Sequence, residues 1–147
     1  MSKISCIRKL NFCAGHRVVG HENKCAHMHG HEYLAEIYAR PKETLDDIGR
    51  VIDFSVIKER VGNWIDRYWD HGFIVNKTDI AALSAIKAFN DHSQFDQKYF
   101  ELPYNPTAEN LARFLLETCK DLFTEYPIEI YKVVIHETPN CRGIYET

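Results

Sequence analysis

The stretch from Cys25 to His31, Cys-Ala-His-Met-His-Gly-His, constrains the fold of this chain more than any other feature. It runs into Tyr-Leu-Ala-Glu-Ile, which predicts a β-strand over 31–40. Side chains two residues apart on a strand point to the same face, so His29 and His31 present both rings on one face. The residues at alternate positions from Tyr33 onward continue that face. The pattern therefore predicts a strand that begins with two imidazoles on the same face.

Two imidazoles spaced in this way can bind a metal when a third ligand arrives from elsewhere in the chain. The best candidate is His16, at the end of a strand predicted within residues 3–19, because a hairpin would place it across from the other two. Zinc favours histidine nitrogen, and a catalytic zinc keeps three protein ligands and one open position. We therefore expect Zn²⁺ to be bound by His16, His29 and His31. His27 has the same parity but precedes the strand, and we expect it to be a bystander.

Cys25 has two possible roles beside such a metal. As a fourth ligand it would close the site and make it structural. As a free thiol near a cation it would lose its proton readily and serve in catalysis. Asp70-His71, at the end of a predicted helix, offers an acid beside an imidazole that can move protons, although an ordinary helix-end pair explains it equally well.

Two further carboxylates are candidate site residues. Glu109 lies in the first turn of a helix that begins at Thr107, where an acidic residue also meets the helix dipole favourably. Glu137 ends a predicted strand whose alternate members Val133 and Ile135 are apolar. A charge on that face is a candidate functional group, because an unpaired buried charge is costly and is not expected in a purely structural position.

The periodicity of the remaining chain predicts an α+β fold. Strands are expected at 3–19, 31–40, 128–137 and 141–146, and helices from Asp53, over 79–90 and from Thr107 to Pro127, with a polar loop at 91–98. The order ββ-α-α-ββ indicates an antiparallel four-stranded sheet with helices on one face. Such a sheet has open edges, so we expect a homo-oligomer.

Length and composition narrow the classes of protein. The 147 residues suit one domain, 1–147. No apolar run is long enough for a membrane span, and the N-terminus does not resemble a secretory signal, so we expect a cytoplasmic protein. Five scattered cysteines fit reduced thiols, and those other than Cys25 should be small packed side chains. The net charge of −3 argues against nonspecific nucleic-acid binding. Arg17 and Lys24 are expected on the solvated surface.

Six segments occur in order along nearly the whole chain: Phe12-Cys13-Ala14-Gly15-His16, Cys25-x-x-x-His29-Gly30-His31, Asp53-Phe54, Asp70-His71, Pro106-Thr107-Ala108-Glu109-Asn110 and His136-Glu137-Thr138. Together they resemble the 6-pyruvoyltetrahydropterin synthase family. Three residues separate Cys25 from His29, as in the 6-carboxytetrahydropterin synthases of the queuosine pathway. The synthases of tetrahydrobiopterin synthesis typically have five.

The resemblance implies a tunnelling fold, in which trimers close a β-barrel, two trimers stack into a hexamer, and active sites lie between subunits. It implies zinc on His16, His29 and His31, and a catalytic Cys25 assisted by Asp70 and His71. Glu137 would anchor the pterin ring, and Thr107 and Glu109 would line the pocket. Two features depart from the family pattern: Gly15 replaces a usual alanine, and residues 77–98 are longer than the usual connection.

The implied reaction converts 7,8-dihydroneopterin triphosphate to 6-carboxy-5,6,7,8-tetrahydropterin, with release of acetaldehyde and triphosphate. Neither a nicotinamide nor a flavin is required. A 6-pyruvoyltetrahydropterin synthase, which stops before the side chain is cleaved, is the alternative within the family. A noncatalytic zinc protein with a closed Cys-His site is the alternative outside it.

Overall fold

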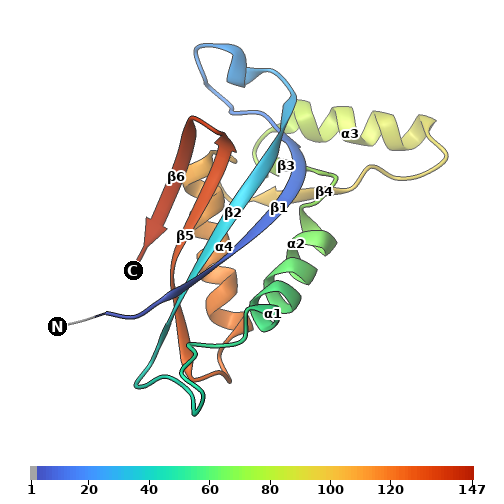
Figure 1. Cartoon of the computed structure of the whole chain (residues 1–147). Helices are drawn as coiled ribbons and strands as arrows, with labels where there is room; N and C mark the ends of the chain where they lie inside the picture. Colours follow the sequence, from blue (N-terminus) through green and yellow to red (C-terminus); the bar gives the residue numbers. More distant parts are fainter. Residues whose placement is uncertain (1–2) are drawn as a thin grey trace.

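A long antiparallel hairpin forms the centre of the sheet (Figure 1). In the computed structural model, which describes residues 3–147, strand β1 (Cys6–His16) pairs with β2 (His29–Pro41) along its whole length. The register joins Cys6 to Ala39 at one end and His16 to His29 at the other. The predicted hairpin is therefore confirmed, and its loop covers residues 17–28.

The sheet contains six strands, in the order β4-β3-β1-β2-β5-β6, and the expectation of four was wrong. The strands β5 (Ile128–Thr138) and β6 (Cys141–Glu146) extend the hairpin on one side with antiparallel pairing, as expected. On the other side β3 (Gly72–Asn76) and β4 (Tyr99–Leu102) pair in parallel, so the sheet is mixed. Parallel neighbours need a crossover connection, which α3 (Ile80–His92) supplies between them.

Two predicted helix starts are confirmed by their caps. The Asp53 carboxylate accepts a hydrogen bond from the Ser55 amide at 2.8 Å, and the Thr107 hydroxyl accepts one from the Asn110 amide at 3.2 Å. The helix after Asp53 has three parts, α1 (Phe54–Ile57), the π-helical turn η2 (Lys58–Gly62) and α2 (Asn63–Tyr68). The helix after Thr107 is α4 (Ala108–Leu122).

The helices α1, α2 and α4 cover one face of the sheet (Figure 1). Alternate residues of β2, from Tyr33 to Ala39, are fully buried against them, as the predicted parity requires. Trp69, at the end of α2, fills the middle of this layer beside Phe12 and Phe114. Helix α3 departs from the expected arrangement, because as the crossover it extends past the end of the sheet (Figure 1). None of the helices described is long and apolar enough to cross a membrane.

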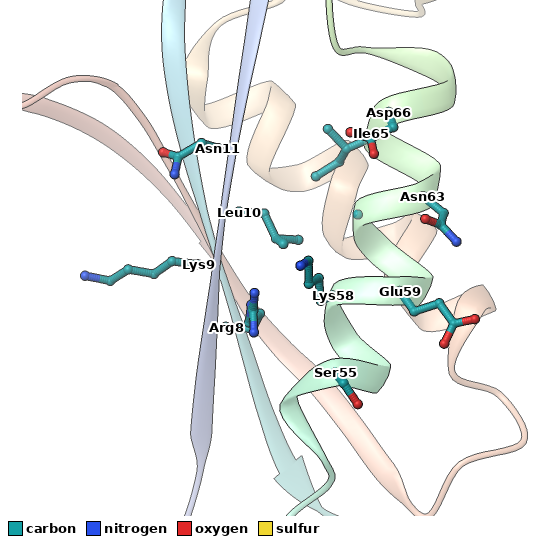
Figure 2. A pocket seen from close by; sticks show the side chains of 11 residues that line it. Arg8, Lys9, Leu10, Asn11, Ser55, Lys58, Glu59, Asn63, Ile65 and Asp66 are labelled. Atoms are coloured by element: carbon teal, nitrogen blue, oxygen red, sulfur yellow. The ribbon is translucent and has the colours of Figure 1, made fainter.

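Strand β1 is only partly covered at its outer edge. It pairs with β3 over Ala14–His16 alone, so the rest of that edge meets no other strand of the described chain. Figure 2 shows the groove that results, with Leu10 and Arg8 of β1 on one side and Lys58 and Asp66 of the helical layer on the other. The sheet therefore keeps an open edge here and another along β6.

Candidate metal centre and active site

Three histidine rings meet where the central hairpin ends. His16 closes β1, and His29 and His31 open β2 on the same face, so each ring centroid lies within 4.6–5.0 Å of the other two. One nitrogen from each ring lies within 4.8 Å of the others. The structure thus brings together the three residues that the sequence analysis selected as metal ligands.

Hydrogen bonds to backbone carbonyls set the protonation of two rings. Nδ1 of His16 donates to the Pro106 carbonyl at 2.6 Å, and Nδ1 of His29 donates to the His27 carbonyl at 2.7 Å. A carbonyl can only accept, so in each neutral ring Nδ1 carries the proton and Nε2 keeps a lone pair. These two Nε2 atoms face each other at 3.1 Å. Two lone pairs at this distance repel unless a cation lies between them.

The third ring completes the case for a metal. Nε2 of His31 is buried and has no hydrogen-bond partner among the described residues, which is costly without a ligand. Burial lowers the pKa of His16 to about 4 and also lowers the pKa of His31. His16 and His31 therefore offer neutral nitrogen at neutral pH, the form that binds a metal. The residues present fit a metal ion held by three Nε2 atoms.

Cys25 lies outside the ligand group. It is half-buried in the short helical turn Lys24–Ala26, and no cysteine of the described chain joins the three nitrogens within 4.8 Å. The nearby buried Tyr33 lies on the metal side of the hairpin, 5.3 Å from the His31 ring. Burial, then the charges of Glu137 and Cys25, raise the Tyr33 pKa. This placement favours a free thiol over a fourth ligand.

Asp70 and His71 form a pair beside the outer edge of β1, where the His71 amide also donates to the Cys13 carbonyl. Nδ1 of His71 donates to the Asp70 carboxylate at 2.7 Å, and the other Asp70 oxygen accepts from the Cys13 amide at 2.9 Å. Burial raises the pKa of Asp70, but these hydrogen bonds outweigh it and hold that pKa below its usual value. The exposed His71, with a left-handed φ of 60°, lines a hollow together with Cys13 and Glu32 and with the metal ligands His29 and His31.

The remaining candidates belong to the end of β5 and the start of α4. Glu137, at the end of β5, places a carboxylate oxygen 3.9 Å from Nε2 of His16. Thr107 is occupied as the cap of α4, and Glu109 is exposed in the first turn of that helix. Pro106, which holds His16 through its carbonyl, is a functional residue that side-chain reasoning could not identify.

Two surface expectations were wrong. Arg17 is not a solvated residue, because its guanidinium pairs with the buried carboxylate of Asp79. Cys13 and Cys141 are exposed rather than packed, whereas Cys119 is fully buried as expected.

The glycine at position 15 is explained by steric contact: a β-carbon there would lie 2.8 Å from the Phe73 ring. The absence of a side chain at 15 therefore makes room for β3 beside β1.

Comparison with known proteins agrees with this geometry. Residues 5–147 match the family model described as 6-pyruvoyl tetrahydropterin synthase. The 6-carboxy-5,6,7,8-tetrahydropterin synthase of Rickettsia bellii is 40% identical over 94% of this chain and 96% of the relative. The protein of that name from Haemophilus influenzae is 30% identical over 99% of both chains.

Solved structures confirm the fold. An uncharacterised protein from Wolinella succinogenes superposes with a TM-score of 0.84 at 21% identity, over 100% of this chain and 99% of the other. The 6-pyruvoyl tetrahydropterin synthase of Caenorhabditis elegans gives 0.67 at 22% identity, over 100% and 97%. The α+β tunnelling fold is thereby confirmed, with six strands in this chain. With the family model matched along nearly its whole length, this chain belongs to the 6-pyruvoyl tetrahydropterin synthase family of enzymes.

Proposed function

We propose that this chain converts 7,8-dihydroneopterin triphosphate to 6-carboxy-5,6,7,8-tetrahydropterin, releasing acetaldehyde and triphosphate, in queuosine biosynthesis. The observation that carries the proposal is the full-length similarity to proteins named 6-carboxy-5,6,7,8-tetrahydropterin synthase. The three-residue spacing between Cys25 and His29 supports the carboxy product over the pyruvoyl one. We take residues 1–147 as one tetrahydropterin-synthase domain. A cytoplasmic location agrees with five free thiols.

We propose zinc as the metal. Zinc–nitrogen bonds of about 2.0–2.1 Å at a tetrahedral angle place two ligand nitrogens about 3.3 Å apart, and Nε2 of His16 and His29 lie 3.1 Å apart. Three protein ligands leave one position open, as in catalytic rather than structural zinc sites. When bound, the ion supplies Lewis acidity to the oxygens of the substrate side chain.

The proton transfers are assigned to the chain's own groups. Cys25, as a thiolate, takes a proton from the substrate side chain. His71 accepts or returns a proton through Nε2, because its Nδ1 is engaged by Asp70. Asp70 stays a carboxylate, with its pKa held low by two hydrogen bonds despite burial, so it can orient the ring and stabilise its charged form.

Glu137 is assigned to the pterin ring. Its carboxylate can accept two parallel hydrogen bonds from the ring N–H groups, which are charge-assisted and therefore strong. Because the carboxylate lies 3.9 Å from the His16 ligand nitrogen, a ring held there carries its side chain toward the metal. Thr107 and Glu109, at the start of α4, line the same region.

We propose a homo-hexamer built from two trimers, with active sites between chains. The open stretch of β1 and the edge strand β6 offer strand pairing between copies, which would cover these two sets of unpaired backbone groups. Within the described chain no hydrogen bond or ion pair joins Cys25 to His71, and Cys25 does not line the hollow that holds His71. A second copy that brings its own Asp70 and His71 to Cys25 would complete the site.

The decisive experiment incubates the zinc-loaded protein with 7,8-dihydroneopterin triphosphate and identifies the products. We expect 6-carboxy-5,6,7,8-tetrahydropterin and acetaldehyde in equal amounts. Formation of 6-pyruvoyltetrahydropterin without acetaldehyde would replace the carboxy assignment with the pyruvoyl one. Absence of any pterin product would remove the proposal.

A Cys25→Ala variant separates the enzyme from a noncatalytic zinc protein. We expect turnover to be lost while one zinc per chain remains bound, because the three nitrogens form the site without the thiol. Cys141→Ala, at the exposed first residue of β6, is the matched control and should keep full activity. Loss of zinc together with folding in the Cys25 variant would instead establish a structural Cys-His site.

A further inference from the structure

The loop that carries Cys25 is closed at its base by Arg17. This residue follows the metal ligand His16 directly, and its Nη1 donates to the carbonyl of Ala26 at 3.3 Å. The amide of Val18 donates to the carbonyl of Cys25 itself at 2.8 Å. Two adjacent carbonyls of the Cys25 turn are therefore held by the first residues of the loop.

The same guanidinium is anchored to a distant part of the chain. Its Nε donates to Oδ2 of Asp79 at 2.5 Å, and its Nη2 donates to Oδ1 at 2.7 Å. Such a paired, charge-assisted contact fixes both the position and the plane of the guanidinium. Asp79 is itself immobilised, because its side chain is only 2% exposed and it caps α3 by accepting from the Ala82 amide at 3.1 Å.

Capping alone does not require this arrangement. Helix α4 is capped by the neutral hydroxyl of Thr107, whereas α3 uses a buried carboxylate, which is expensive to desolvate. A buried ion pair is weak grounds for stability, but it specifies geometry when its partners are fully hydrogen-bonded. Each hydrogen bond described for the Arg17 guanidinium is donated either to Asp79 or to the Ala26 carbonyl in the Cys25 turn.

We propose that the Arg17–Asp79 pair positions the Cys25 thiol relative to the three histidines, so that Arg17 and Asp79 are positioning residues for the reaction. The inference rests on the proposed function in that Cys25 is the reacting thiol. It also gives a role to the start of the long segment 77–98, because Asp79 in that segment anchors the loop that carries Cys25. Neither residue contacts a metal ligand through its side chain in the hydrogen bonds described.

The test compares Arg17→Met, Arg17→Lys and Asp79→Asn with the wild-type protein. Asparagine keeps an oxygen for the Ala82 amide and loses the charge, while lysine keeps the charge and loses the paired geometry. Arg40→Met is the matched control, because Arg40 pairs with Glu129 at 2.9 Å between β2 and β5, outside the loop. Circular dichroism and zinc content establish that each variant folds and binds metal.

The first readout needs no substrate. Iodoacetamide modification is followed by mass spectrometry at Cys25, with the exposed Cys141 as internal reference. Release of the loop should raise the Cys25 rate about threefold or more in Arg17→Met and Asp79→Asn, relative to Cys141. Arg17→Lys should fall between these variants and the wild type, and Arg40→Met should equal the wild type.

The second readout is turnover. We expect kcat to fall by about 10-fold to 100-fold with KM within about twofold, because a thiol displaced by about 1 Å loses reactivity rather than substrate affinity. An unchanged Cys25 rate in Arg17→Met and Asp79→Asn overturns the proposal, whatever the turnover. Loss of zinc in variants that still fold also overturns the proposal, because the Arg17–Asp79 pair would then maintain the metal site and not the position of the Cys25 thiol alone. A wild-type protein without turnover refutes the proposed function, while the alkylation rates still decide the positioning role.

Discussion

The replacement of Gly143 by alanine should destabilise the protein strongly. Gly143 lies on β6 against the first turn of α4, and a β-carbon there would lie 2.5 Å from the Glu109 amide nitrogen and 2.6 Å from the Ala108 carbonyl carbon. Both are backbone atoms, so no side-chain rotation relieves the clash and the helix start must move by about 1 Å. Overpacking of this kind costs about 1–3 kcal/mol, and we expect a value near the upper end, about 3 kcal/mol.

The same substitution at Gly62 should have the opposite sign. This residue lies in a helical turn with φ of −60°, and the nearest atoms to an added β-carbon are Leu10 Cδ2 at 3.8 Å and Lys58 Cγ at 3.9 Å. These are ordinary contacts. Because alanine loses less backbone entropy on folding than glycine, Gly62→Ala should stabilise the protein by about 0.5–1 kcal/mol.

Urea unfolding at one fixed protein concentration measures both changes. With a slope of about 2 kcal/mol per molar urea, the midpoint should fall by about 1.5 M in Gly143→Ala and rise by about 0.3–0.5 M in Gly62→Ala. The Gly143 variant should also retain zinc less well, because the displaced turn follows Pro106, whose carbonyl holds His16. A Gly143→Ala protein as stable as the wild type would refute the steric reasoning.

Three further predictions follow from the site. In the metal-free protein, burial lowers the His16 pKa to about 4, whereas a histidine in the unfolded chain has a pKa of about 6.5. The unfolded state therefore takes up the proton first, and urea midpoints should fall as the pH decreases from about 6.5 toward 4; His16→Gln should flatten this dependence. Glu137→Gln should raise KM about tenfold or more at constant zinc content, because a charge-assisted contact contributes about 1.5–3 kcal/mol; an unchanged KM would reject the pterin-anchor role. Lys98→Met removes two donations, to the carbonyls of Asp66 and Asp70, at 2.6 Å each, and should lower the unfolding free energy by about 1–3 kcal/mol; urea denaturation showing no loss would contradict this.

The features that follow from local pattern were predictable. Alternation along β2 predicted which side chains are buried, and Asp53 and Thr107 predicted two helix starts because capping is a local interaction. The approach of His16 to His29 also followed from sequence, since a hairpin sets the register of its two strands. These interactions involve residues that are near in the chain or joined by one turn.

The features that depend on distant partners were not predictable. β3 has five residues, and its only signal is a short apolar run, because it becomes a strand by pairing with β1, from which more than fifty residues separate it. Arg17 looked like a surface charge because its partner Asp79 is 62 positions away. Cys13 has the small, apolar character of a core residue, but its parity places it on the face opposite α1, α2 and α4. In each case tertiary context decided the outcome.

The position of His71 in a hollow that Cys25 does not line has a genetic consequence. Under the proposed assembly, each chain gives its thiol to one active site and its imidazole to another. Two inactive alleles, one encoding Cys25→Ala and the other His71→Ala, should then complement each other when co-expressed. Random mixing of equal amounts leaves roughly a quarter of the sites with both groups intact, because the chain that supplies Cys25 retains it with probability about one half and the chain that supplies His71 retains it with the same probability. A strain with either allele alone would lack the activity, and the strain with both would regain about that fraction.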